Sequence, residues 1–210
     1  MTNYSLSLEN IKKIFGRRLV FKKINYSFRS GKIYGIAGPN GSGKSTIAKI
    51  IAGVLSPTKG IIIYKIDDKK IVTEKIHNHI GFVSPYLVMY EEFSAKENLN
   101  YFQKIRGKSV DNEKIEYWLN EFELYDRRDD LVKGFSSGMK QRLKLIFSFI
   151  HDPEFVVLDE PTSNLDNAGK EKVCNIIKDK FEHKLIILAS NENNDLSLCG
   201  EILELAKYKN

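Results

Sequence analysis

The sequence predicts an α/β protein with a mostly parallel sheet, and three observations lead to this fold class. The stretches 32–37, 155–158 and 185–189 are short and almost continuously apolar, as strands buried on both faces are. Segments with helical character separate these strands along the chain. A glycine-rich loop follows the first strand and leads directly into a helix. Strands that alternate with helices are typical of a parallel sheet.

The first part of the chain is expected to be rich in strands. A turn lies at 29–31, and the helix after the glycine-rich loop ends at Gly53. Alternating or continuous apolar positions place strands at 5–12, 19–28, 32–37, 60–64, 70–73 and 79–83, and the helix at about 44–53.

The stretch from about 94 to 150 is predicted to be helical and to interrupt the alternating core. Its first helix begins at a capping box, with Ser94 as the N-cap and Glu97 three residues later. Two further helices are expected near 112–124 and 137–151. The alternation then resumes with strand 155–158, a helix near 167–182, strand 185–189, a short helix and strand 201–206.

Length and composition indicate a single soluble domain. The chain has 210 residues, 42% hydrophobic and 29% charged, without an apolar run long enough to span a bilayer and without a signal peptide. Two cysteines are too few for a disulfide framework and suit a reducing cytosol. The net charge of +6 is dispersed, which favours a mildly basic solvated surface, also suited to an anionic membrane face, over a nucleic-acid interface.

Residues 38–46 match the phosphate-binding pattern G-x-x-x-x-G-K-[ST] at every fixed position. Glycines let the backbone wrap closely around phosphates, and the N–H groups at a helix N-terminus attract the anion. Lys44 supplies a charge for the β- and γ-phosphates, and the Ser45 hydroxyl can ligate Mg²⁺. We expect ATP to contact Gly38, Pro39, Asn40, Gly41, Ser42, Gly43, Lys44, Ser45 and Thr46.

The strand at 155–158 has the form of a Walker B strand. Its four apolar residues place Asp159 and Glu160 at the carboxyl end, where ligands collect in open α/β sheets. We expect Asp159 to hold Mg²⁺ and Glu160 to activate the attacking water as a general base.

Residues 135–142, Phe-Ser-Ser-Gly-Met-Lys-Gln-Arg, lie between these two motifs at the head of a predicted helix. This segment resembles the signature sequence of the ABC (ATP-binding cassette) ATPases. The resemblance extends over nearly the whole chain, and the short length is similar to the haem-exporter ATPase type. It implies a P-loop, RecA-like parallel core at about 1–85 and 151–210, with an antiparallel β-subdomain at its start. A helical subdomain would occupy about 86–150.

The resemblance also assigns roles that the spacing alone does not. Phe15 would stack on adenine, and Asp166, in a segment similar to the D-loop, would help align two nucleotide sites across a dimer. The signature residues Ser136, Ser137 and Gly138 would complete the ATP site of a second copy or of a homologous cassette.

Two positions depart from the family pattern. The Q-loop glutamine falls on Pro85, which offers no side-chain oxygen, and the switch histidine falls on Asn191, whose amide can still donate one hydrogen bond. The departures leave two hypotheses, a slow ATPase or a nucleotide-gated scaffold with little or no hydrolysis. We favour the ATPase because Glu160 is retained.

The expected function is therefore that of a cytoplasmic ATPase on the inner face of the cell membrane. Hydrolysis would drive a separate membrane permease, docked near 86–93, and no nucleic acid is expected as a partner. A soluble, non-transport ABC ATPase is the alternative. It is less favoured because the chain holds one cassette and no coiled coil separates its two Walker motifs.

Overall fold

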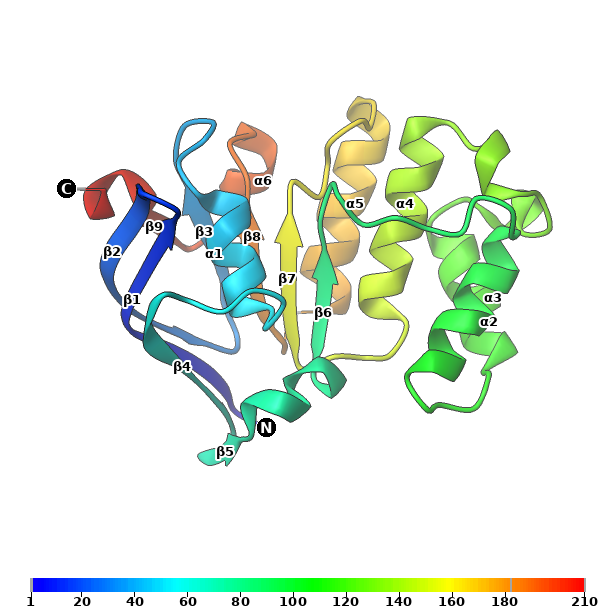
Figure 1. Cartoon of the computed structure of the whole chain (residues 1–210). Helices are drawn as coiled ribbons and strands as arrows, with labels where there is room; N and C mark the ends of the chain where they lie inside the picture. Colours follow the sequence, from blue (N-terminus) through cyan, green and yellow to red (C-terminus); the bar gives the residue numbers. More distant parts are fainter. Residues whose placement is uncertain (1, 182, 210) are drawn as a thin grey trace.

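The computed structural model describes residues 2–181 and 183–209, which form two sheets with helices around them (Figure 1). The larger sheet has five strands, and every strand pairing in it is parallel. Its order is β6 (Ile80–Val83), β7 (Phe155–Asp159), β8 (Leu185–Ala189), β3 (Ile33–Ala37) and β9 (Glu201–Glu204). The predicted parallel core is confirmed.

The second sheet is antiparallel and covers the helix that follows the glycine-rich loop. Its order is β2 (Arg18–Arg29), β1 (Tyr4–Phe15), β4 (Lys59–Ile66) and β5 (Lys69–Ile71). Helix α1 (Lys44–Ile51) lies between this sheet and the parallel one (Figure 1).

The parallel sheet is buried on both faces, so its alternate residues enter two different cores. Phe155 and Val157 face α1 and the antiparallel sheet, whereas Val156 and Leu158 face the helices on the other side. This explains the unbroken apolar runs of β7 and β8, because no position of either strand reaches water.

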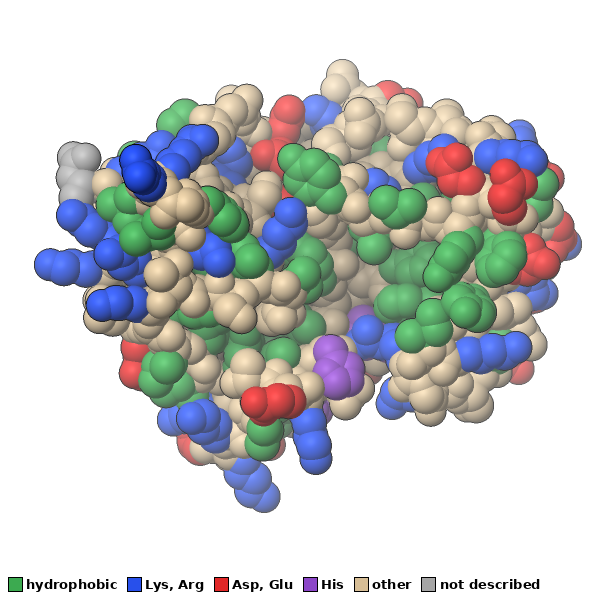
Figure 2. Space-filling view, viewed as in Figure 1, with side chains coloured by type: hydrophobic (Ala, Val, Ile, Leu, Met, Phe, Trp, Pro, Cys, Tyr) green, Lys and Arg blue, Asp and Glu red, His purple; other side chains and the backbone are tan. Residues whose placement is uncertain are grey.

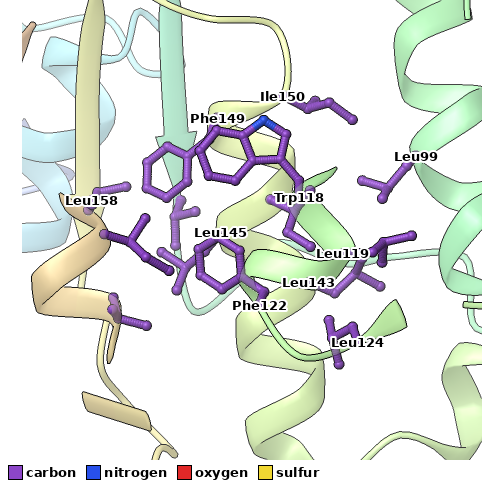
Figure 3. Close-up of a cluster of buried hydrophobic side chains, with 14 of the residues drawn as sticks. Leu99, Trp118, Leu119, Phe122, Leu124, Leu143, Leu145, Phe149, Ile150 and Leu158 are labelled. Atoms are coloured by element: carbon purple, nitrogen blue, oxygen red, sulfur yellow. The ribbon is translucent and has the colours of Figure 1, made fainter. Parts of the chain in front are cut away.

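Three helices form the middle of the chain: α2 (Ala95–Ile105), α3 (Asn112–Glu121) and α4 (Ser137–Phe149). The predicted capping box begins α2, with Ser94 and Glu97 exchanging both hydrogen bonds. Aromatic rings join α3 and α4: Trp118 lies against Phe122 and Phe149, surrounded by leucines (Figure 3).

The middle of the chain is less helical than predicted. Residues 106–111 and 122–136 are turns and loops apart from two short 3₁₀ segments, Tyr125–Arg127 and Val132–Gly134. A further 3₁₀ segment at Thr73–Asn78 was not expected.

The C-terminal part contains α5 (Asn167–Lys180), α6 (Asn193–Ser197) and a final 3₁₀ turn at Leu205–Tyr208. The expected strand 201–206 ends at Glu204, and buried Leu205 begins the turn. The expected helix 167–182 ends at Lys180, and residue 182 lies outside the described residues. Among residues 2–181 and 183–209, no helix has the length and apolar character needed to cross a bilayer.

Candidate nucleotide-binding site

A cavity of about 420 Å³ lies where the carboxyl ends of the parallel strands meet the antiparallel sheet. The loop before α1 and the end of β7 are both at the top of Figure 1. Parallel strands deliver their carboxyl ends to one edge, and for this reason motifs far apart in sequence meet here. The lining residues are Phe15, Arg18, Val20, Asn40, Gly41, Gly43, Lys44, Ser45, Thr46, Tyr86 and Glu160.

The glycine-rich loop leaves the first N–H groups of α1 free to bind an anion. Gly43 is the N-cap of α1, and no side chain caps this end. Its φ of 106° is left-handed, and a Cβ there would lie 2.6 Å from Val20 Cγ1. Only glycine fits this position. Because a glycine N-cap has no side chain to bind the first N–H groups of α1, the helix terminus stays open to phosphate.

Lys44 is buried at the base of the cavity between the loop and the Walker B acid. Its Nζ donates to the Gly38 carbonyl oxygen at 2.9 Å and lies 3.9 Å from Glu160 Oε1. The ammonium group is therefore held between the loop that would cradle phosphates and the carboxylate that would act on the attacking water.

Asp159 and Ser45 meet as a pair of oxygen ligands. Ser45 Oγ donates to Asp159 Oδ1 at 3.0 Å, and Asp159 Oδ2 is buried without a partner among the described residues. Burial raises the pKa of Asp159, opposed by the Ser45 hydrogen bond and by Lys49 and Lys44. An orphaned carboxylate oxygen beside a hydroxyl fits Mg²⁺, which binds few protein oxygens and completes its shell with phosphates and water.

Glu160 is held in a strained backbone conformation by contacts on several sides. Its φ is 52°, and its N–H donates to the Ala189 carbonyl oxygen at 2.9 Å. Gln141 Nε2 donates to the Glu160 and Pro161 carbonyl oxygens at 3.3 and 2.9 Å. A left-handed non-glycine residue survives only where its surroundings enforce it, as at functional sites.

The carboxylate of Glu160 has an environment suited to a general base. Burial raises its pKa, opposed first by the charge of Lys44 and then by the hydrogen bond from Ser190 Oγ at 3.2 Å. A carboxylate with a raised pKa accepts a proton more readily than one in water.

Asn191 and Phe15 lie at the rim. Asn191 Nδ2 donates to Asn40 Oδ1 at 3.2 Å, which places the amide against the phosphate loop. Phe15 is 50% exposed and lines the cavity, with Lys13 Nζ 4.8 Å from its ring centroid. The roles of Asn191 at the γ-phosphate and of Phe15 at adenine stay predictions.

The signature and D-loop residues are not brought to this cavity within one chain. Ser136 and Asp166 are the N-caps of α4 and α5, accepting hydrogen bonds from the Met139 and Gly169 N–H groups. Neither they nor Ser137 and Gly138 line the cavity in the described part of the chain. The two motifs touch one another instead, because a Cβ on Gly138 would lie 3.2 Å from the Asn164 carbonyl oxygen.

Several residues of the site were not predicted. Arg18 and Tyr86 line the cavity, and Gln141 and Ser190 hold Glu160. The sequence signal for Ser190 was its place directly after strand β8, at the same sheet edge as Glu160.

Pro85, at the position of the family's Q-loop glutamine, takes part only through its backbone in the described contacts. Its carbonyl oxygen accepts a hydrogen bond from Lys144 Nζ at 2.8 Å.

Comparisons with known proteins identify the family. The model of the family described as "ABC transporter" matches residues 21–163. The chain is 35% identical over 204 residues to the lantibiotic transport ATP-binding protein SrtF of Streptococcus pyogenes, covering 97% of this chain and 84% of that protein. It is 34% identical to the Nod factor export ATP-binding protein I of Bradyrhizobium diazoefficiens, covering 82% of this chain and 57% of that protein.

Solved structures agree with the fold. An ABC transporter ATP-binding protein from Pyrococcus furiosus superimposes with a TM-score of 0.84 at 26% identity, covering 98% of this chain and all of that one. The dimeric cassette MJ0796 gives a TM-score of 0.80 at 24% identity, covering 95% and 94%. The predicted P-loop fold is confirmed. The chain belongs to the ABC transporter ATP-binding proteins, and it is an ATP-binding and ATP-hydrolysing subunit of this family.

Proposed function

We propose that two copies of this chain, or this chain and a homologous cassette, close head-to-tail on two ATP molecules. The observation that carries this proposal is the separation of Ser136, Ser137 and Gly138 from the cavity that holds Lys44. A signature that does not reach its own phosphate loop would be available to the nucleotide on the loop of a second subunit. One solved relative is described as a dimeric cassette, which supports self-association in general.

The geometry supports a role for each residue of the cavity. The free N–H groups of the α1 N-terminus and the Lys44 ammonium would bind the phosphates. Glu160 would take the proton of the attacking water. Ser45 and Asp159 would hold Mg²⁺, which supplies charge neutralisation for the phosphates when bound.

Turnover should be slow because two polar groups at the γ-phosphate are altered. Pro85 has no side-chain donor or acceptor, and Asn191 is already engaged with Asn40. Loss of one preorganised transition-state contact costs roughly 10²–10³-fold in rate.

The permease would dock on an aromatic surface beside the helical region. Tyr90, Phe93 and Tyr101 are exposed, with neighbouring ring centroids 5.4–6.1 Å apart, and Tyr86 and Val88, in the loop before them, are exposed as well. Green side chains gather over this part of the molecule in Figure 2. Clustered exposed rings are typical of protein interfaces. We propose that the subunit works here as a peripheral protein on the inner face of the cell membrane.

The composite site is tested by placing an acid on the signature. Ser137 is exposed at the first position of α4, where an acidic side chain favours the helix. Ser137→Glu should fold and bind ATP as the wild type does at low protein concentration, because Ser137 does not line its own cavity. Its turnover should vanish, because the added charge repels the partner's γ-phosphate.

The matched control is Asn112→Glu, an exposed first position of α3. Wild type and Asn112→Glu should show turnover that rises faster than linearly with protein concentration, while Lys44→Ala and Glu160→Gln show none. Turnover by Ser137→Glu equal to that of the control would refute the composite site. ATP-dependent dimers without turnover in the wild type would instead indicate a nucleotide-gated scaffold.

A further inference from the structure

A second cavity, of about 210 Å³, lies at the opposite end of the molecule from the nucleotide site. Its walls come from the end of α2, the turn 106–111, the start of α3 and the residues after α4. In Figure 1 the turn between α2 and α3 is at the bottom, whereas the loop before α1 is at the top. Its polar lining is Gln103, Arg106, Lys108, Ser109, Asp111, Lys114 and His151.

The cations of this cavity have no counter-ion among the described residues. Within residues 2–181 and 183–209, no carboxylate oxygen lies within 4.0 Å of Arg106, Lys108 or Lys114. Asp111 is used as the N-cap of α3, where it accepts from the Lys114 N–H at 2.9 Å. The lining therefore holds three positive charges against one negative charge.

Arg106 is the most constrained of these cations. It lies over the Phe102 ring at 5.1 Å from the centroid and donates to the His77 carbonyl oxygen. Burial lowers its pKa, the usual cost of a charge without a partner. Arg106 also contributes, after burial, to the lowered pKa of the adjacent His151.

Gln103 adds an unused donor. The residue is 5% exposed, and its Oε1 accepts from the Asp111 N–H at 2.8 Å, which sets the orientation of the amide. Its Nε2 then has no partner among the described residues. Buried amide donors are almost always paired in native proteins, so an unpaired one beside three cations indicates a missing acceptor.

We infer that this cavity binds a small phosphate-bearing anion, held by Arg106, Lys108 and Lys114 with Gln103 Nε2 as a neutral donor. The volume of about 210 Å³, against about 420 Å³ for the nucleotide cavity, leaves room for one phosphate group. Charge-assisted hydrogen bonds from several cations are the usual means of holding phosphate. The inference is independent of the proposed dimer and permease.

The anion is either free or part of a lipid headgroup, and the same variants distinguish the two. Inorganic phosphate is titrated into the protein saturated with Mg-ADP, so that the nucleotide loop is filled. Binding is followed by calorimetry and by the Gln103 side-chain amide signal in ¹H–¹⁵N spectra. A parallel arm measures sedimentation with phosphatidylcholine vesicles that contain or lack phosphatidic acid.

Lys108→Ala/Lys114→Ala should weaken binding at least about tenfold, because two charged contacts are lost. The matched control is Lys69→Ala/Lys70→Ala, two exposed lysines of β5. If Lys108→Ala/Lys114→Ala loses vesicle binding, and neither variant responds to free phosphate, the bound anion is the lipid headgroup. The inference is overturned if the Gln103 signal shows no saturable response in either the phosphate arm or the vesicle arm.

Gln103→Glu gives an independent test that does not depend on loss of folding. The new carboxylate keeps an acceptor for the Asp111 N–H and supplies the missing counter-ion. The variant should melt at a higher temperature than the wild type in phosphate-free buffer and should gain nothing from added phosphate. A variant that melts as the wild type does and gains the same stabilisation from phosphate would contradict the inference.

Discussion

Replacement of Gly81 by alanine tests how closely the helical region is joined to the nucleotide core. Gly81 is buried in β6, opposite Val156 of β7. A Cβ built there would lie 2.0 Å from the Ser148 carbonyl oxygen in α4 and 2.9 Å from Pro153 Cγ. The first obstacle is backbone, which no side-chain rotation can relieve.

The expected cost follows from this distance. An ordinary contact begins near 3.4 Å, so β6 and α4 must separate by more than an ångström. Overpacking a core costs about 1–3 kcal/mol, and a backbone obstacle between two buried elements favours the upper end. A loss of about 3 kcal/mol in the free energy of unfolding lowers Tm by about 6–12 °C in a protein of this size.

Urea unfolding of Gly81→Ala is compared with that of Gly134→Ala. Gly134 has no atom within 4 Å of a built Cβ, so its alanine variant should stay within about 0.5 kcal/mol of the wild type. ATP turnover by Gly81→Ala should also fall, since β6 leads to Ser84 and Pro85 and α4 begins at the signature. A Gly81→Ala variant as stable as Gly134→Ala would refute the described contact between β6 and α4.

Three further outcomes are expected. Turnover should decline as pH falls, because Glu160 must be ionised, and burial moves this decline to a higher pH than for an exposed carboxylate. Ser190→Ala removes a hydrogen bond to the carboxylate and should move the acid limb of the pH–rate profile to a still higher pH. Asp195 is buried with a raised pKa, so its ionisation costs stability as pH rises through the folded pKa. Asp195→Asn keeps the acceptor for Thr162 Oγ1, and its gain in the free energy of unfolding should be absent in acid and grow with pH. Trp118→Ala should cost about 3–5 kcal/mol in chemical unfolding, because it removes a ring stacked on Phe181 and tilted against Phe149.

The parallel core and the phosphate loop could be predicted because their signals are local. Residues 155–158 of β7 and all of β8 are apolar, and the glycine pattern before Lys44 is specific to a phosphate-binding loop. Once the sheet is parallel, Asp159 must reach the same edge as Ser45, and the 3.0 Å contact between them follows. The roles given to the residues remain predictions.

The support of Glu160 could not be predicted because it comes from two separate parts of the chain, α4 and the end of β8. Gln141 reaches it from α4, Ser190 from the end of β8 and the Ala189 carbonyl from the strand itself. Arg18 and Tyr86 enter the cavity in the same way, from elements brought together only by folding. Hydrophobic periodicity indicates which face of an element is buried, but it carries no information about which polar group lies opposite.

The contacts of α4 bear on how two nucleotide sites would communicate. Gln141 in its second turn holds the carbonyl oxygens of Glu160 and Pro161, and Gly138 at its start lies against the Asn164 carbonyl oxygen. The signature of one chain is therefore packed onto the same loop that carries its own Glu160 and Asp166. A displacement of the signature by a partner's nucleotide should shift that loop as well, because Gln141 joins α4 to the Glu160 and Pro161 carbonyl oxygens and close-packed interiors transmit strain. Binding at one site would thus reach Glu160 of the other through α4, without a route through the sheet.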